Sequence, residues 1–221
     1  MTGKQIRLNR LFSGGLNAVV VAADHGMLNW SSHFCFHWGY EEGVAVPAMD
    51  PADAVAAGAD ILLVCLTLRT GSEARDAANV KVFCSLLNEA KKMGMPVVGE
   101  FFPARPDRLT PEELHEQVYR GCRIVAELGA DLIKTFYTQK FSEVTEGCPI
   151  AILGLGAEKT PKQIQALELA ERIVQGGGRG VVFGRNAIQV ADPVAFQKAL
   201  CDVVKRGISA GKAAEQYGLI D

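Results

Sequence analysis

The 221-residue sequence lacks any apolar run near the roughly 20 residues that a membrane-spanning helix needs. It also lacks an excess of charge of one sign, because 23 Lys and Arg residues stand against 25 Asp and Glu residues. No basic block typical of nucleic-acid-binding proteins is present. The opening MTGKQIRLNRLF has no apolar core followed by a small-residue cleavage site, so we expect no signal peptide. We therefore expect a soluble, cytoplasmic, globular protein with neither a membrane nor a nucleic acid as its partner.

The sequence has no Cys-x-x-Cys pair, and its six cysteines lie far apart. Most of them sit in apolar stretches, where a free thiol behaves as a small core residue. His33, Cys35 and His37 would share one face of a strand, and they are zinc ligand types. The aromatic residues between them favour a half-buried strand or an interface patch. We therefore expect no metal and no other cofactor.

Apolar, β-branched runs alternate with helical segments from residue 50 onward. This alternation predicts βα units and a parallel sheet. Clear strands are expected at 18–23, 60–67, 96–102, around 133, at 148–153 and at 180–183. Helices are expected at 4–12, 50–58, 73–94, 110–128, 160–174, 192–206 and 209–217.

Two weaker strand candidates, near 33–38 and 44–48, decide the fold class. With both, the chain forms a (β/α)8 TIM barrel, a compact α/β fold with irregular or reduced second and third βα units. Without them it has six strands, and the sheet could be open. We expect the barrel, formed by residues 1–221 as one domain, because neither a linker nor a change of composition interrupts the chain.

Lys134 follows the apolar pair Leu132-Ile133 in the segment GADLIKTFYT at 129–138. Burial at the end of a strand removes water from a lysine, which disfavours the ammonium form and favours a nucleophilic amine. Such an amine attacks carbonyl carbons and forms Schiff bases. We therefore predict Lys134 as the catalytic nucleophile. From the residues alone, a strand-end lysine turned to solvent remains an alternative.

Polar and charged residues recur where the expected strands end. A first group consists of candidate catalytic residues: Asp24, His25, Glu100 and Tyr137. The last two strands lead into glycine-bearing turns before helices, and backbone N–H groups in such turns favour an anion. The candidate phosphate-binding residues are Gly154, Gly156, Gly184 and Arg185. A tight strand-to-helix turn explains a Gly-x-Gly sequence equally well.

Three segments resemble the class I aldolases of the DeoC/LacD/FbaB group, which includes the archaeal-type fructose-bisphosphate aldolases. They are AADHG at 22–26, GADLIKTFYT at 129–138 and GGRGVVFGRNAIQ at 177–189. The resemblance implies a (β/α)8 barrel, a Schiff-base lysine at Lys134 and an active-site aspartate at Asp24. It further implies phosphate contacts from the last two loops, a small phosphorylated substrate, carbohydrate metabolism and assembly as a homo-oligomer.

The sequence departs from this family at three places. Many relatives have a Tyr-Pro, whose tyrosine moves protons, where this chain has Phe102-Pro103. The proton-transfer role would then pass to Asp24, His25, Glu100 or Tyr137, or to a water, and Glu100 is the best-placed replacement base. The stretch between the first strand and Asp60 is shorter than in the family by roughly two βα units. The usual Gly-Gly after the seventh strand is replaced by a Gly-Leu-Gly at 154–156.

Three functions remain open from the sequence. The first is a class I aldolase or lyase that acts on a phosphorylated ketose or a related ketone phosphate through Lys134. The second is a thiolase-like acyl transfer on a phosphorylated diketone with the same lysine. The third is a catalytically degenerate barrel that binds or regulates, which the missing tyrosine and the shortened front half would favour.

Overall fold

The computed structural model describes residues 2–13, 15–23, 44–47 and 49–219. Six strands form one parallel sheet with the order β1-β6-β5-β4-β3-β2. The strands are β1 (Ala18–Val21), β2 (Leu62–Leu66), β3 (Val97–Phe101), β4 (Leu132–Thr135), β5 (Ala151–Leu155) and β6 (Gly180–Phe183). The two strands at the edges of the sheet, β1 and β2, are consecutive among the described strands.

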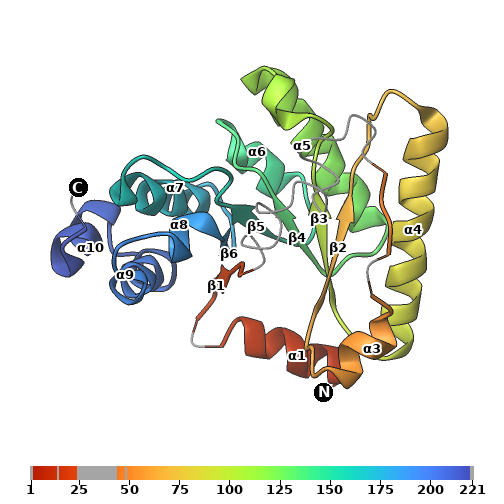
Figure 1. Ribbon diagram of the computed structural model, residues 1–221, viewed down its shortest axis with the longest axis horizontal. Helices are drawn as coiled ribbons and strands as arrows, with labels where there is room; N and C mark the ends of the chain where they lie inside the picture. The colour runs from red at the N-terminus through yellow and green to blue at the C-terminus, as the bar shows by residue number, and fades with distance from the viewer. Residues whose placement is uncertain (1, 14, 24–43, 48, 220–221) are drawn as a thin grey trace.

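The described helices are α1 (Gly3–Leu11), α3 (Pro51–Ala56), α4 (Glu73–Lys92), the 3-10 turn η1 (Pro106–Arg108), α5 (Pro111–Glu127), α6 (Phe141–Glu146), α7 (Gln163–Gln175), α8 (Arg185–Ile188), α9 (Pro193–Arg206) and α10 (Ala210–Tyr217). Helices α4, α5, α7 and α9 pack against the strands and cover one face of the sheet (Figure 1). The six expected strands and the seven expected helices are present, with ends shifted by a few residues. Within the described part of the chain, no helix is long and apolar enough to cross a membrane.

Local sequence signals set several helix ends. The expected capping box at α5 is present, because the Thr110 hydroxyl accepts the Glu113 N–H at 3.2 Å and the Glu113 carboxylate accepts the Thr110 N–H at 2.9 Å. Asp50 caps α3, whose first residue is Pro51. Two short helices, α6 and α8, were not expected from the sequence, since neither is long enough to show helical periodicity.

The weak strand candidates have different outcomes. The prediction of a strand at 44–48 is wrong for residues 44–47, which form no strand. Pro47 accounts for this, because proline cannot donate to a ladder of hydrogen bonds. The candidate near 33–38, with the His33, Cys35 and His37 group, lies outside the described residues.

The sheet has an outer face under the helices and an opposite, inner face. Alternate residues of each strand face opposite sides. Ile133 lies in the large apolar cluster between sheet and helices, whereas Leu153 and Val182 form a second, smaller cluster. Leu11 and Phe12, at the end of α1, pack against this second cluster. The inner face is therefore closed by α1 at one end.

Helix α1 lies across the N-terminal ends of the strands (Figure 1). Its basic side chains reach the residues just before three strands: Arg10 pairs with Asp60 at 2.6 Å, Arg7 donates to the Gly94 carbonyl at 3.0 Å, and Lys4 pairs with Asp131 at 2.5 Å. The second oxygen of Asp131 accepts the Val97 N–H at 3.0 Å. This end of the sheet is thus held by ion pairs, and the opposite, C-terminal end carries the candidate site.

Candidate active site

Lys134 and Glu100 meet on the inner face of the sheet. They are register partners on the adjacent strands β4 and β3, so their side chains leave the sheet on the same side. The Lys134 Nζ lies 2.8 Å from the Glu100 Oε1, and the two side chains are only 14% and 12% exposed. The structure therefore excludes a lysine turned to solvent.

Packing on the outer face fixes the position of Glu100. A Cβ atom on the preceding Gly99 would lie 2.4 Å from the Val125 Cγ1 and 3.1 Å from a ring carbon of Phe83. Glycine at this point lets α5 and α4 approach β3 closely. Because the sheet alternates, the residue after this outward-facing glycine points inward, beside Lys134.

Lys134 and Glu100 form an ion pair that is largely shielded from water. Two opposite charges held out of water at 2.8 Å attract each other more strongly than at a surface. The ammonium donates a charge-assisted hydrogen bond to the carboxylate. The amine must lose its proton before it can attack a carbonyl carbon, and the Glu100 carboxylate is within hydrogen-bonding distance to accept that proton.

Two aromatic residues follow Glu100 and Lys134 along their strands. The Phe102 N–H donates to the Leu66 carbonyl at 3.1 Å, which continues the ladder of β3 beyond Phe101 and places Phe102 on the Glu100 side. The Phe136 ring, two residues after Lys134, meets the Phe102 ring edge-on with centroids 4.9 Å apart. Phe102 is only 6% exposed. Alternation along the strands therefore places two aromatic side chains after the charged pair, and the Phe136 ring also packs against the large apolar cluster.

The other candidate catalytic residues do not join this pair in the described structure. Asp24 and His25 lie outside the described residues. Tyr137 stacks on Phe141 with centroids 5.4 Å apart, and the Arg172 guanidinium lies 5.9 Å from the centre of the Tyr137 ring. Tyr137 belongs to the layer between sheet and helices, so the structure offers no contact through which it would serve Lys134.

Two of the candidate phosphate-binding glycines have packing roles. The placement of Gly154 in a loop was wrong, because Gly154 lies inside β5. A Cβ there would be 2.5 Å from the Ile173 Cδ1, so glycine allows α7 to pack against the sheet. The Gly156 N–H donates to the Val182 carbonyl at 3.2 Å. Phosphate binding by these two glycines remains a prediction, and the N–H of Gly156 is already engaged.

Gly184 and Arg185 begin the four-residue helix α8. The Gly184 carbonyl accepts the N–H groups of Ala187 and Ile188 at 2.8 and 3.1 Å. The Arg185 Nη2 donates to the Ala157 carbonyl at 3.0 Å. Arg185 therefore connects the loops that follow β5 and β6.

Asn186 is a residue whose importance the sequence did not reveal. The residue is 3% exposed, and its side-chain amide donates to the carbonyls of Gly156 and Glu158, both at 2.9 Å. Its Oδ1 accepts the Thr160 N–H at 2.8 Å. A single side chain thus fixes the loop after β5 to the loop after β6, and the only available signal was an Asn in the turn after a strand.

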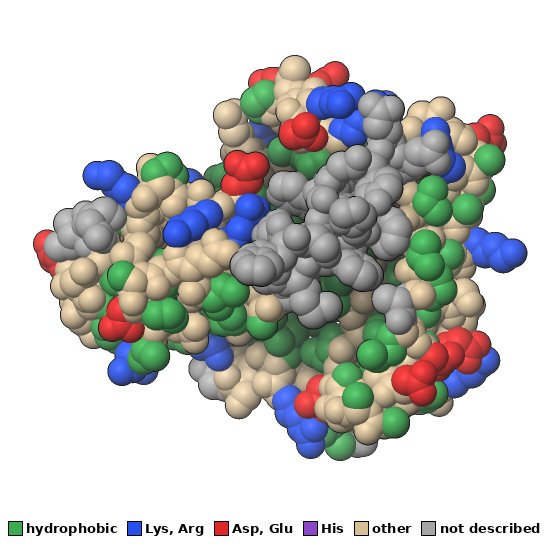
Figure 2. Space-filling model, viewed as in Figure 1, with side chains coloured by type: hydrophobic (Ala, Val, Ile, Leu, Met, Phe, Trp, Pro, Cys, Tyr) green, Lys and Arg blue, Asp and Glu red, His purple; other side chains and the backbone are tan. Residues whose placement is uncertain are grey.

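A cavity of about 430 Å³ lies beside this clamp. Its lining comes from the loop after β5 and from the end of α8: Lys159, Thr160, Pro161, Lys162, Gln163, Asn186, Gln189, Val190 and Ala191. Two lysines and several hydrogen-bonding side chains give it a polar, cationic character. On the face shown in Figure 2, basic and acidic side chains are mixed.

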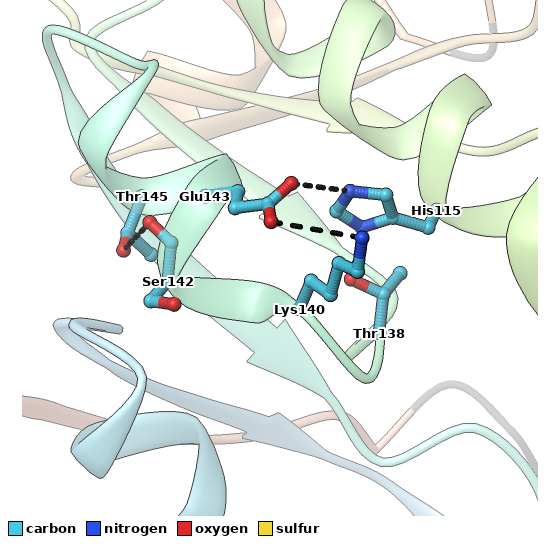
Figure 3. Close-up of polar contacts among 6 residues, drawn as sticks. All are labelled: His115, Thr138, Lys140, Ser142, Glu143 and Thr145. Carbon is cyan, nitrogen blue, oxygen red and sulfur yellow. Dashed lines mark hydrogen bonds and ion pairs between the residues drawn. The ribbon is translucent and has the colours of Figure 1, made fainter.

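A second polar cluster surrounds the connection between β4 and α6 (Figure 3). The His115 Nδ1 lies 3.0 Å from the Thr138 Oγ1, and its Nε2 lies 3.2 Å from the Glu143 Oε2. Lys140 is 3.8 Å from the same carboxylate. His115 carried no readable signal in the sequence, because its partners are 23 and 28 residues away. It fixes the loop that follows the Lys134 strand.

The described cysteines are free thiols. Burial raises the pKa of the Cys122 thiol, and the nearby Cys148 raises it further. Burial also raises the pKa of Cys148, whose Sγ lies 3.9 Å from the Cys122 carbonyl. Both thiols behave as core residues, as expected. Among the described residues, no group of three or more potential metal ligands is present.

The profile of the DeoC/LacD family aldolases matches residues 37–190. The chain belongs to this family. The match includes β2 to β6 and both members of the Lys134–Glu100 pair, and it confirms the resemblance drawn from the sequence.

Relatives of this chain carry the names of a thiolase and of an aldolase. A 3-hydroxy-5-phosphonooxypentane-2,4-dione thiolase of Salmonella typhimurium is 34% identical over 182 residues, which cover 80% of this chain and 57% of that protein. An uncharacterised aldolase of Pasteurella multocida is 34% identical over 150 residues, or 66% of this chain and 49% of that protein. The chain spans about half the length of the curated relatives that it matches.

Solved structures confirm the α/β fold of the TIM-barrel aldolases. An archaeal fructose 1,6-bisphosphate aldolase superimposes with a TM-score of 0.73 at 20% identity, covering 92% of this chain and 99% of that chain. A fructose-bisphosphate aldolase from Slackia heliotrinireducens gives a TM-score of 0.67 at 18% identity, covering 96% and 76%. The chain keeps this fold with six described strands.

Proposed function

We propose that this chain is a Schiff-base-forming carbon–carbon lyase that acts on a phosphorylated ketose or a related ketone phosphate. The observation that carries the proposal is the 2.8 Å contact between Lys134 and Glu100 on the inner face of the sheet. Membership of an aldolase family and similarity to Schiff-base-forming aldolases of the same fold support it.

The pair accounts for the first chemical step. Glu100 takes a proton from the Lys134 ammonium, and the free amine attacks the ketone carbon, forming a carbon–nitrogen bond and a carbinolamine. Glu100 then returns the proton to the carbinolamine hydroxyl, which leaves as water, and a protonated Schiff base remains. The hydroxyl next to the carbon–carbon bond then loses its proton to the Glu100 carboxylate, the bond breaks, and its electron pair passes to the positive nitrogen, which leaves an enamine on Lys134 and releases the other fragment as a carbonyl compound.

The remaining candidates fit the same scheme. Asp24 would orient the amine or move protons, and His25 is a weaker candidate for proton transfer. The loops fixed by Asn186, with Gly184, Arg185 and the two lysines of the adjacent cavity, would hold the phosphate. Binding the phosphate would fix the ketone near the amine and supply proximity.

Trapping with borohydride tests the proposal. The protein is incubated with dihydroxyacetone phosphate and a panel of phosphorylated ketoses, reduced, digested and mapped by mass spectrometry. An adduct on Lys134 is expected, whereas Lys134→Arg should give none. Lys140→Arg, which changes an exposed lysine, is the matched control and should trap as well as the unaltered protein. Absence of an adduct with every ketone, in folded protein, would refute the proposal.

A thiolase-like acyl transfer is the second candidate, and the relative named as a phosphorylated-diketone thiolase favours it. It would use the same lysine but deliver an acyl group to a thiol. Incubation with a phosphorylated diketone, with and without coenzyme A, separates the two candidates. A thioester formed only with the thiol present indicates acyl transfer, and cleavage without it indicates a lyase. Binding of the ketone phosphate without either product would point to the degenerate, regulatory barrel.

We further propose that the protein works in the cytoplasm, in carbohydrate metabolism. We also propose that it binds a small phosphorylated substrate and assembles as a homo-oligomer. Light scattering of the purified protein tests the assembly. A mass equal to one chain at micromolar concentration would contradict it.

A further inference from the structure

A thiol, a carboxylate and an amine belong to one row across three neighbouring strands. Cys65 on β2 is the register partner of Glu100 on β3, and Glu100 is the register partner of Lys134 on β4. Neighbouring strands lie about 4.8 Å apart, so the Cys65 backbone is about 5 Å from that of Glu100 and about 10 Å from that of Lys134. Glu100 is therefore the middle residue of this row.

The Cys65 side chain lies on the same face of the sheet as the ion pair. Val64 and Leu66 belong to the large apolar cluster between sheet and helices, so Cys65 between them points to the inner face. Leu63 shares this face and is 48% exposed, and Cys65 is itself partly exposed. Solvent therefore reaches the inner face of β2, next to the strand that carries Glu100.

The ion pair holds the reactive amine near the middle of the row. The Lys134 Nζ lies 2.8 Å from the Glu100 Oε1, and a substrate carbon bonded to that nitrogen would lie about 1.5 Å beyond it. A three-carbon ketone phosphate is longer than the spacing between neighbouring strands, about 4.8 Å. A ketone bonded to Lys134 therefore has the length to reach the strand that carries Cys65.

We propose that Cys65 is a third residue of the active site, and that its thiol is a modification site for a ketone phosphate with a leaving group on the carbon next to the carbonyl. Bromoacetol phosphate, with bromine on the unphosphorylated arm, is such a reagent. The Cys65 sulfur attacks the brominated carbon, a sulfur–carbon bond forms, and the carbon–bromine bond breaks. Bromide leaves, and the proton of the thiol passes to the Glu100 carboxylate or to water. The inference rests on the proposed Schiff-base function, because the site around Lys134 delivers the ketone.

The chain contains thiols that serve as internal controls. Among the described cysteines, Cys84 and Cys201 are also partly exposed, but they lie on the helices α4 and α9. Each thiol is labelled with bromoacetol phosphate and, separately, with iodoacetamide, and the rates are followed by peptide mass mapping. The ratio of the two rates at one thiol cancels the intrinsic reactivity of that thiol.

A reagent bound beside a thiol gains proximity that a freely diffusing reagent lacks. We therefore expect the ratio at Cys65 to exceed the ratios at Cys84 and Cys201 by at least about 10-fold. Dihydroxyacetone phosphate fixed to Lys134 by borohydride should slow iodoacetamide labelling of Cys65 by at least about 5-fold, because labelling requires an exposed sulfur, and should leave Cys84 and Cys201 within about 2-fold.

Lys134→Arg removes the amine that forms the adduct, so borohydride treatment with the ketone should no longer protect Cys65. Cys84→Ser is the matched control and should change neither the trapping on Lys134 nor the labelling of Cys65. Circular dichroism checks that each variant is folded.

Equal ratios at the three thiols, or unchanged labelling of Cys65 after the ketone has been trapped, would overturn the inference. The proposed function would remain intact in both cases, since Lys134 still carries the ketone. Absence of an adduct on Lys134 with every ketone would overturn the proposed function, and this inference with it.

Discussion

Replacing Glu100 by Gln tests whether the Lys134–Glu100 contact is a buried ion pair. The substitution keeps the shape and one acceptor oxygen but removes the negative charge 2.8 Å from the ammonium. Breaking a buried pair by removing one partner costs about 3–5 kcal/mol, because the other charge is left uncompensated. The two side chains are still 12–14% exposed to solvent. We therefore expect the free energy of unfolding to fall by an amount near the lower limit, about 3 kcal/mol.

This loss is measurable by urea denaturation followed by circular dichroism. For a chain of this size it corresponds to a fall in Tm of about 6–12 °C. The double variant Glu100→Gln/Lys134→Met removes both charges, so its free energy of unfolding should return to within about 1 kcal/mol of the unaltered protein.

The exposed pair between Glu89 and Lys92, at 2.7 Å with 47% and 68% exposure, provides the matched control. Glu89→Gln should change the free energy of unfolding by less than about 0.5 kcal/mol. The reasoning fails if Glu100→Gln costs no more than this control. It also fails if Lys134→Met in the Glu100→Gln background brings no recovery of stability.

Three further predictions concern the packing around the site. Gly154→Ala should lower the free energy of unfolding by about 1–3 kcal/mol in urea denaturation, because its new methyl group would meet Ile173 at 2.5 Å. Asn186→Ala should cost about 2–4 kcal/mol and make the loop at 157–162 the first site of limited proteolysis, since three backbone groups lose their partners. At pH 8, maleimide should label the partly exposed Cys84 well before Cys148, because burial raises the pKa of the Cys148 thiol and leaves less thiolate.

Each of these has a clear contrary result. A Gly154→Ala variant as stable as the unaltered protein would mean that α7 can move away from β5 at no cost. Unchanged proteolysis of Asn186→Ala would show that the loop is held by other contacts. Equal labelling rates for the two thiols would show that the helix layer opens faster than the reagent reacts.

The arrangement of βα units was predictable because each strand from residue 60 onward is a short apolar run bounded by helical periodicity. The position of Lys134 inside the sheet followed from the same argument. Its contact with Glu100 could not be predicted, because it depends on the register between β3 and β4, and no local sequence pattern encodes that register. The glycine at 99 was a possible signal, since a glycine inside a strand marks close packing on one face.

The errors have physical reasons as well. A Gly-x-Gly sequence such as that at 154–156 occurs both in phosphate-binding loops and where a helix packs closely on a strand. In the structure, Gly154 lies where α7 packs closely against β5. Tyr137 follows Lys134 by three residues, so alternation alone would place it on the opposite face, where the structure has it. His115 and Asn186 act through hydrogen bonds to residues distant in the sequence, and such contacts leave no periodicity.

The separation in sequence of the paired strands has a consequence for the order of folding. Thr135 bonds the Phe101 carbonyl across β3 and β4 over 34 residues, and α5 fills the intervening chain as one compact βαβ unit. At the other edge, Arg179 before β6 bonds the Leu16 carbonyl before β1 across 163 residues. Closing the longer loop costs more entropy and is slower. We therefore expect Lys134 and Glu100 to come together during folding before β1 pairs with β6. The inner face that receives the substrate is then completed last.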